Sequence, residues 1–251
     1  MVVTPANVAL DVALTLAKTF HEQTKLNAIR PEKEGCSLSI GVVLAPVKYP
    51  FGLLQDLAES ALKFAKKEAA KRKIAKQQPK TEYSDTIINF MVVTGSNSLD
   101  FKQVYDGLHE KYGKVDGRDA QFYATLRPYT VEGLAELLEM IRKGKQLGLG
   151  RTKLHQVREA VLRMNLNTSV SEGVAVLNNW RTQQREFVVK EFYKPAERYQ
   201  EKYYDVGKPA TLFPRVTFPW FADGPDTYRT SLLDLVELYD FVAQEEIEDG
   251  K

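Results

Sequence analysis

Residues 37–44 read SLSIGVVL, and residues 58–66 read AESALKFAK. In the first stretch an apolar residue stands at every second position, which predicts a β-strand with one apolar face. These residues are Leu38, Ile40, Val42 and Leu44. In the second stretch apolar residues recur every three or four positions, which predicts one side of a long helix from about residue 52 to residue 76. We therefore predict the fold from this strand and the helix that follows it.

The same alternation continues on both sides of this unit. Residues 1–4 are apolar and β-branched and predict a strand, and Thr4 with Pro5 predicts the start of a buried helix that runs to about residue 23. The apolar residues of that helix are Val8, Leu10, Val12, Leu14, Leu16 and Ala17. Residues 86–94 are almost continuously apolar and predict a strand buried on both faces. The first hundred residues therefore predict a sheet with helices packed on it.

After Pro128 the pattern becomes mainly helical. Thr130 is a suitable cap for the first helix of this region, and Gly148 and Gly150 are suitable residues to end it. Further helical patterns follow, and a final amphipathic helix is predicted for residues 231–244. The change of pattern places a domain boundary near residue 125.

The composition is that of a soluble globular protein, with 43% apolar and 27% charged residues. No apolar run of about 18 residues predicts a membrane helix, and the first residues lack a secretory signal pattern. Cys36 is the single cysteine, and the three histidines have no zinc-site spacing. We therefore expect a cytoplasmic protein without an intrachain disulfide or a structural zinc site.

The net charge of +2 is uninformative, but its distribution is uneven. Residues 63–80 hold eight Lys or Arg against one acid, and residues 142–163 hold seven against one acid. Such segments are typical either of solvated helix faces or of surfaces that contact an RNA backbone or nucleotide phosphates. The sequence leaves both interpretations open.

The strand and helix described first resemble the second half of a GGDEF-type nucleotide cyclase palm. That family has an S-I-G-V strand, found here at residues 39–42, followed by an A-D-x-A-L-Y-x-A-K helix, found here at residues 58–66. Glu59 stands in place of the family's Asp, and Lys63 in place of its Tyr.

Three further segments narrow the resemblance. They read YPFGLL at residues 49–54, TLRPYT at residues 125–130 and TSLLDLVELYDF at residues 230–241. In this order they look like the second palm and the C-terminal helical domain of the large, polymerase-like subunit of type III CRISPR effector complexes. The resemblance implies an α+β fold, in which a partial ferredoxin-like (GGDEF- or cyclase-type) palm over residues 1–125 is followed by an α-helical domain over residues 126–251.

The resemblance also implies a function and shows a departure from the family. In this family a G-G-D-D hairpin binds two divalent metal ions that align ATP for oligoadenylate synthesis. The present sequence contains neither G-G-D-D nor G-G-D-E-F. We therefore expect no catalytic or metal-binding residue in this chain and no activity of the chain alone. ATP is a possible ligand, and Mg²⁺ or Mn²⁺ is expected only if a partner chain supplies the acidic motif.

Three interpretations of function remain open. The first is a subunit or fragment of an RNA-guided antiviral effector that contacts other effector subunits and reaches crRNA and target RNA indirectly. The second is half of an oligoadenylate-synthesising cyclase, completed by a chain that bears G-G-D-D. The third is an unrelated α/β scaffold protein. A split gene, a truncation or a degenerate copy would each account for the missing motif.

The resemblance implies nucleotide-binding roles for Ser39, Gly41 and Lys66. Lys66 matches the family's lysine that reaches nucleotide phosphates, a task suited to a compact ammonium group; the alternative is a solvated lysine on a basic helix. Ser39 and Gly41 lie on the strand that faces the nucleotide in the family. The alternative for these two residues is simple packing of a helix on a sheet.

Two further features have structural interpretations. Arg127, Pro128 and Tyr129 are expected to form the junction between the palm and the helical domain, with the Tyr129 ring buried. The aromatic and basic residues of segment 192–204 can either stack on RNA bases or form a helix core and a subunit interface.

Overall fold

The computed structural model describes residues 1–26, 35–74, 86–93, 100–115, 118–163, 166–191, 219–222 and 227–243. The chain divides into two compact units. Unit 1 comprises residues 1–104, 127–138 and 240–243, and unit 2 comprises the rest. Near the predicted boundary the chain passes from unit 2 back into unit 1, between Leu126 and Arg127. It also passes between the units at other points. A division into domains 1–125 and 126–251 stays a prediction.

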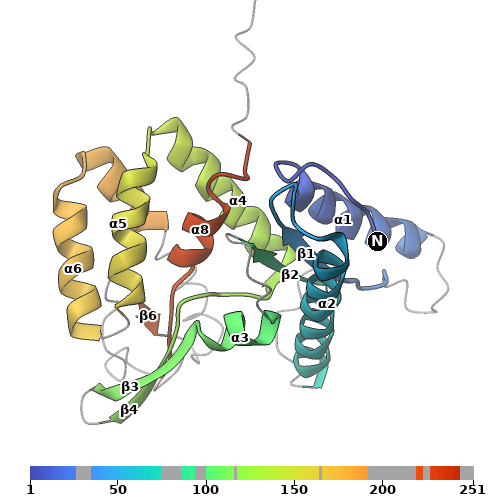
Figure 1. The fold of residues 1–251 in the computed structure, drawn as a ribbon, viewed down its shortest axis with the longest axis horizontal. Coiled ribbons are helices and arrows are strands. Elements are labelled where there is room, and N and C mark those ends of the chain that lie inside the picture. The colour runs from blue at the N-terminus through green and yellow to red at the C-terminus, as the bar shows by residue number, and fades with distance from the viewer. Residues whose placement is uncertain are drawn as a thin grey trace, which may run out of the picture. The chain divides into compact units, whose positions relative to one another are not determined.

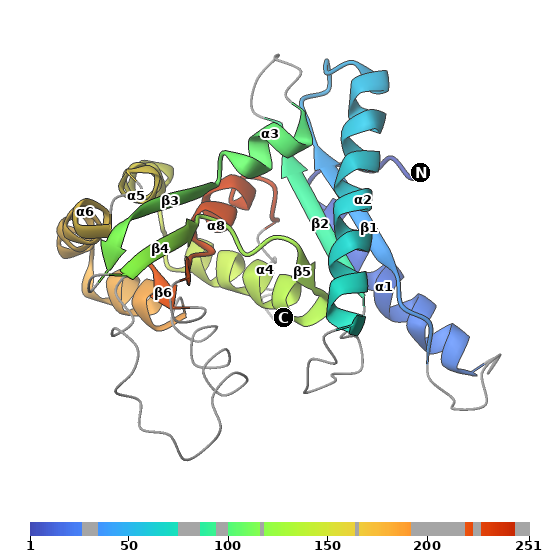
Figure 2. The same cartoon turned by 90° about the horizontal axis from the view of Figure 1, so that it is seen from below.

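Unit 1 contains a three-stranded sheet in the order β1-β2-β5. Strand β1 (Ser39–Leu44) is parallel to β2 (Ile87–Val92), and β5 (Tyr129–Thr130) is antiparallel to β2. A parallel pair needs a long crossover connection, which helix α2 (Phe51–Ile74) supplies. Figure 2 shows α2 lying along β1 and β2. The strand and the long helix predicted around residues 37–76 are confirmed, as is the burial of β2.

Helix α2 packs on the sheet through small residues. Its buried residues recur every fourth position and are Leu57, Ala61, Ala65 and Ala69. Alanine lets the helix backbone approach the strands closely, and Ala65 and Ala69 form a buried cluster with Ile87. The Ala-rich sequence of the helix therefore reflects close packing against β1 and β2.

The N-terminal part of unit 1 differs from the sequence prediction in two respects. The predicted strand at residues 1–4 is wrong, because no strand forms there and Met1, Val2 and Val3 are 72–76% exposed. Helix α1 (Ala9–Leu26) is present, and its Leu10, Leu14 and Ala17 are buried as predicted.

The predicted burial of the other three apolar residues of α1 is wrong. Val8, Val12 and Leu16 are 37%, 40% and 50% exposed. Each residue turns the helix by about 100°, so these positions lie on a different side from the buried residues. The apolar arc of α1 is thus wider than the surface that covers it in the described part of the chain. The ferredoxin-like arrangement stays a prediction.

Unit 2 combines a four-stranded sheet in the order β3-β4-β7-β6 with several helices (Figure 1). Strands β3 (His109–Val115) and β4 (Arg118–Tyr123) form an antiparallel hairpin, β7 (Thr227–Arg229) is parallel to β4, and β6 (Phe221–Ala222) is antiparallel to β7. Helices α5 (Arg151–Leu162) and α6 (Leu166–Asn178) lie side by side, residues 182–191 are helical, and α8 spans Leu232–Leu238.

Two helices have residues in both units. These are α3 (Phe101–Asp106) and α4 (Val131–Gln146). The predicted ends of α4 are confirmed: the Thr130 hydroxyl accepts a hydrogen bond from the Gly133 N–H at 3.1 Å, and Gly148 follows the helix with a φ of +67°. A positive φ is the conformation in which glycine commonly ends a helix.

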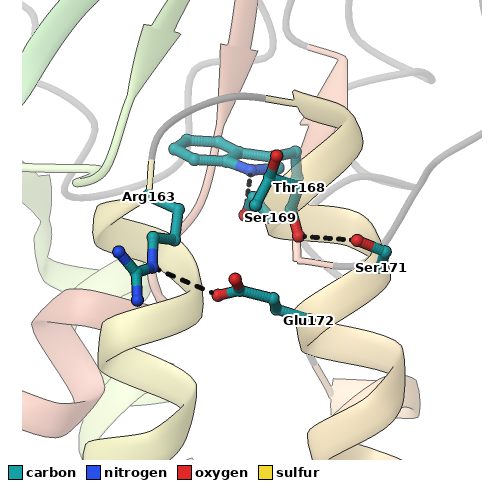
Figure 3. A network of polar contacts seen from close by, with 6 residues as sticks. Arg163, Thr168, Ser169, Ser171 and Glu172 are labelled. Atoms are coloured by element: carbon teal, nitrogen blue, oxygen red, sulfur yellow. Dashed lines mark hydrogen bonds and ion pairs between the residues drawn. The ribbon is translucent and has the colours of Figure 1, made fainter.

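An aromatic cluster forms the centre of unit 2. Phe122 stacks on Tyr228 with ring centroids 5.0 Å apart. The Trp220 and Phe122 rings are nearly perpendicular, with centroids 5.2 Å apart. The Trp220 indole N–H donates to the Ser169 hydroxyl at 2.9 Å, so the polar end of this buried ring has a partner. Figure 3 shows Ser169 beside an ion pair between Arg163 and Glu172, whose closest atoms are 3.4 Å apart.

Within the described part of the chain, no helix is both long and apolar enough to cross a lipid bilayer.

Candidate functional site

Gly41 lies where α2 comes closest to β1. A Cβ atom at this position would be 2.5 Å from the Leu62 backbone nitrogen and 2.6 Å from the Ala58 carbonyl oxygen. Both neighbours are helix backbone, which has no alternative rotamer and cannot move aside cheaply. Packing of α2 on β1 therefore requires glycine here, whether or not a ligand binds nearby.

Asn89 completes this contact from the neighbouring strand. It pairs with Gly41 in the β1–β2 register, and its side-chain N–H group donates to the Ala61 carbonyl in α2 at 3.3 Å. Its side-chain oxygen accepts the Phe90 N–H at 3.0 Å. Asn89 is fully buried and thus fixes the helix to the sheet through hydrogen bonds, a role that the sequence reading missed. An Asn inside an otherwise apolar strand was the available signal.

Ser39 is on the same face of β1 as Gly41, because it lies two residues earlier. Its side chain is half-buried, and its hydroxyl makes no hydrogen bond to any described residue. The hydroxyl is therefore available to a ligand or to water.

Lys66 is exposed on α2 and has no ion pair or hydrogen bond within the described ranges. Helix α2 runs antiparallel to β1, and Gly41 lies against Leu62. Ser39 lies about 6.6 Å before Gly41 along the strand, and Lys66 lies four residues, or about 6 Å, after Leu62 along the helix. Ser39 and Lys66 thus lie toward the same end of this strand–helix pair. The structure thus places Ser39 and Lys66 at a similar level along the pair and gives Gly41 a packing role between the two elements.

Acidic ligands do not gather around these residues. Among the residues that the structure describes, no group of three or more His, Cys, Asp or Glu side chains lies close enough to hold a metal ion. Within the described residues the arrangement offers an ammonium group without an ion pair and a hydroxyl without a hydrogen bond, a combination that suits phosphate oxygens.

Residues 1–75 match the family model for the second palm domain of Cas10/Cmr2. No curated protein matches the chain. The Cas10/Cmr2 match contains α1, β1 and α2 and ends one residue after α2, so Ser39, Gly41 and Lys66 all lie within it. Residues 76–251 lie outside it, and their resemblance to the family's helical domain stays a prediction.

A second feature of the Cas10/Cmr2-like segment is a cavity of about 290 Å³ at the start of α2. It is lined by the first turns of α2 and by Asp100 and Phe101. Ser60 is the lining residue nearest to Lys66 in the helix, and six residues of helix correspond to about 9 Å. The cavity is therefore separate from the predicted nucleotide-binding residues.

The predicted junction residues have structural contacts within unit 1. Tyr129 is 6% exposed and stacks on Phe90 with ring centroids 6.1 Å apart, which confirms the predicted burial of its ring. The Arg127 guanidinium lies over the same Phe90 ring at 4.8 Å and donates to the Phe90 carbonyl at 3.3 Å. The aromatic segment 192–204 lies outside the described residues.

The two basic segments differ in their surroundings. All seven Lys and Arg of residues 142–163 have an interaction partner within the described chain. Lys143, for example, lies 2.6 Å from Glu139, and this hydrogen bond raises the pKa of Lys143. In α2, by contrast, Lys66 and Lys67 have no partner among the described residues. Lys63 and Lys71 of the same helix are paired with Glu59 and Glu68. The interpretation as a paired helix surface therefore suits all of the second segment but only part of the first.

Proposed function

We propose that this chain is a subunit or fragment of a type III CRISPR effector, an RNA-guided antiviral complex of the cytoplasm. The observation that carries the proposal is the match of residues 1–75 to the Cas10/Cmr2 second palm domain. In this proposal the palm-like part of the chain binds a nucleotide. The helical region contacts other effector subunits, and crRNA and target RNA are reached through them.

The chemistry assigned to the chain is phosphate binding. Lys66 supplies a positive charge without a partner in the described part of the chain, and Ser39 supplies a hydroxyl toward the same end of the strand–helix pair. Gly41 lets α2 lie close to β1, which supports a site between these two elements. ATP is the proposed ligand, because the family's palm uses it. Mg²⁺ or Mn²⁺ would accompany it only in a complex with a chain that carries the acidic motif.

The surface of unit 1 supports a role inside a complex. Strand β1 is at the edge of its sheet, and an edge strand offers unpaired N–H and C=O groups to another chain. Val12, Leu16 and Phe20 of helix α1 form an exposed apolar row with Val8, which directly precedes the helix. Exposed apolar surface next to a free strand edge is typical of protein interfaces. We infer that a partner covers this side of the unit, and a chain that bears G-G-D-D is one candidate.

A second candidate function is half of an oligoadenylate-synthesising cyclase, completed in trans by such a chain. The specific observation in its favour is that Lys66 has no ion pair or hydrogen bond to any described residue, since such a lysine is expected to contact substrate phosphates. The two proposals differ in whether the assembled complex makes oligoadenylate.

Replacement of Lys66 tests the nucleotide site. In the assembled complex, Lys66→Ala is expected to weaken ATP binding by roughly ten- to a hundredfold, or about 1.4–2.7 kcal/mol, the range for hydrogen bonds to charged groups. Isothermal titration calorimetry measures the affinity, and circular dichroism checks the fold. Lys143→Ala is a matched control, because it removes the same charge from a lysine that is paired with Glu139. An unchanged ATP affinity in Lys66→Ala would assign Lys66 to the solvated surface.

The purified chain by itself is expected to make no cyclic or linear oligoadenylate from ATP with Mg²⁺ or Mn²⁺. The physical reason is that the sequence lacks the acidic hairpin, so the metal ions have no ligands of the kind that the family uses. Chromatography of the reaction mixture detects product. Product formed by this chain without any partner would contradict the proposed division of labour.

A further inference from the structure

Helix α2 carries a row of lysines on the side that faces away from its sheet. The sheet-facing residues Ala61, Ala65 and Ala69 are buried, and a lysine follows two positions after each of them. Two residues turn an α-helix by about 200°, so Lys63, Lys67 and Lys71 form a row on the opposite side. All three are exposed, the side chains of Lys63 and Lys71 by 73% and 65%. Lys66 follows Ala65 directly and lies on the flank instead.

The lysine row is only weakly neutralised. Lys67 has no partner in the described ranges of the chain. Lys63 is 3.6 Å from Glu59 in an exposed pair, and Lys71 is 3.8 Å from Glu68, whose side chain is 26% exposed; both pairs lie within the same helix. Exposed pairs of this kind contribute about 0–1 kcal/mol, so a polyanion can displace the glutamates at little cost.

The spacing of the row suits a repeating anion. Four residues of helix correspond to about 6 Å, so the three ammonium groups recur at that interval on long flexible stems. Successive phosphates along a nucleic acid strand are separated by a similar distance. A protein surface has carboxylates at this interval only where its sequence places them every fourth residue of a helix or every second residue of a strand. Every unit of a sugar–phosphate backbone carries a charge, so the regular row favours such a backbone as the partner.

We propose that the lysine row Lys63, Lys67 and Lys71 binds the phosphate backbone of single-stranded nucleic acid. This contact is direct and separate from the nucleotide site assigned to Ser39 and Lys66. It does not depend on a partner chain or on bound ATP. It also gives the basic segment that begins at Lys63 a function that the palm resemblance does not assign.

The test measures how salt changes the affinity of the full-length chain for a fluorescent 20-nucleotide single-stranded RNA, by fluorescence anisotropy. Each phosphate neutralised on a single strand contributes about −0.7 to the slope of log K against log salt concentration. The triple variant Lys63→Ala, Lys67→Ala, Lys71→Ala is therefore expected to lower the steepness of the slope by about 2. Its affinity at low salt should fall by about tenfold or more.

A charge-matched triple variant provides the control. Lys143→Ala, Arg158→Ala and Arg163→Ala also removes three positive charges, but these residues are paired with Glu139, Glu159 and Glu172. The control should keep the wild-type slope, which separates a specific row from an effect of net charge. Single-stranded DNA of the same sequence shows whether the backbone alone is recognised or the RNA 2′-hydroxyl adds to it; either result agrees with the proposal.

Three results would overturn the proposal. The wild-type chain could fail to bind RNA at low salt, or the lysine-row variant could keep the wild-type slope while circular dichroism shows an intact fold. An acidic peptide of equal charge could bind as tightly as RNA and lose affinity equally in the variant, which would identify the partner as a protein. Lys66→Ala distinguishes the lysine row from the proposed nucleotide site. It should weaken ATP binding but change the salt dependence of RNA binding by less than the slope of one phosphate, about 0.7.

Discussion

The buried polar groups of unit 2 and the surface polar groups of unit 1 have different roles. In unit 2 the buried polar groups bind one another: Asp234, fully buried, accepts the Thr125 hydroxyl at 2.7 Å and the Leu126 N–H at 2.9 Å. The Gln184 side chain donates to the carbonyls of Leu147 and Gly148 at 2.8 and 2.9 Å. In unit 1 a serine hydroxyl, two lysines and a strand edge have no partner among the described residues. These buried groups stabilise unit 2, whereas the surface groups of unit 1 stay available for binding; unit 1 also has a buried polar group, Asn89, that is hydrogen-bonded within its own fold.

This difference bears on how a basic segment should be interpreted. The segments that begin at residues 63 and 142 have similar charge in the sequence, and either could have been assigned to nucleic acid. The acids that neutralise Lys143 and Arg158 lie on the same helices, and Arg163 is paired with a residue of the next helix. A charge cluster therefore indicates a binding surface only when its partners within the fold are known.

The largest expected effect concerns the buried carboxylate of unit 2. Asp234→Ala removes two charge-assisted hydrogen bonds and leaves a buried hydroxyl and a buried N–H unpaired, so the free energy of unfolding should fall by about 3–5 kcal/mol. Urea denaturation followed by circular dichroism measures it. Asp106→Ala, at an exposed position, should change the free energy by less than about 0.5 kcal/mol. If the two variants had equal free energies of unfolding, the hydrogen bonds of buried Asp234 would not contribute to the stability of unit 2.

A smaller effect is expected at the helix–strand contact of unit 1. Gly41→Ala places a Cβ 2.5 Å from helix backbone, and the resulting overpacking should cost about 1–3 kcal/mol. Gly52, in the first turn of the same helix, is the matched control, because a Cβ there meets no atom within 4 Å. Gly52→Ala should be neutral or stabilising by up to about 1 kcal/mol. Equal stability of the two variants would show that α2 can move away from β1.

The smallest effect separates the units without any mutation. Amides of β1 and β2 should exchange with deuterium at least about ten times faster than amides of α5 and α6, a difference of about 1.4 kcal/mol. The reason is the strand edge and the apolar face of unit 1, which no described residue of the chain covers. Mass spectrometry of exchanged peptides and limited proteolysis measure this difference. Equally slow exchange in both sets would mean that unit 1 needs no partner.

The reliability of the sequence predictions varied with the kind of signal. Strand β1, strand β2, helix α2 and the ends of α4 were predictable, because each has a local pattern: alternation, a four-residue repeat, or a capping residue. The strand at residues 1–4 was wrong, since a short apolar stretch forms a strand only beside a pairing partner. In α1 the sequence has apolar residues on more than one side of the helix, and the pattern does not indicate which side packs against the rest of unit 1. Asn89 was missed because its role depends on the Ala61 carbonyl, 28 residues away.

The sequence alone determined the order of the elements from α1 to β2, the S-I-G-V and A-L-K-F-A-K resemblance to a palm, and the absence of G-G-D-D from the chain. These are properties of composition and short-range spacing, which folding does not alter. Only the tertiary structure decided that Gly41 is needed for packing, that the segment from residue 142 is internally paired, and that Lys63, Lys67 and Lys71 face away from the sheet. The physical reason is that the neutralisation of a charge or the space for a Cβ depends on neighbours that folding brings close, and many of these neighbours are distant in the sequence.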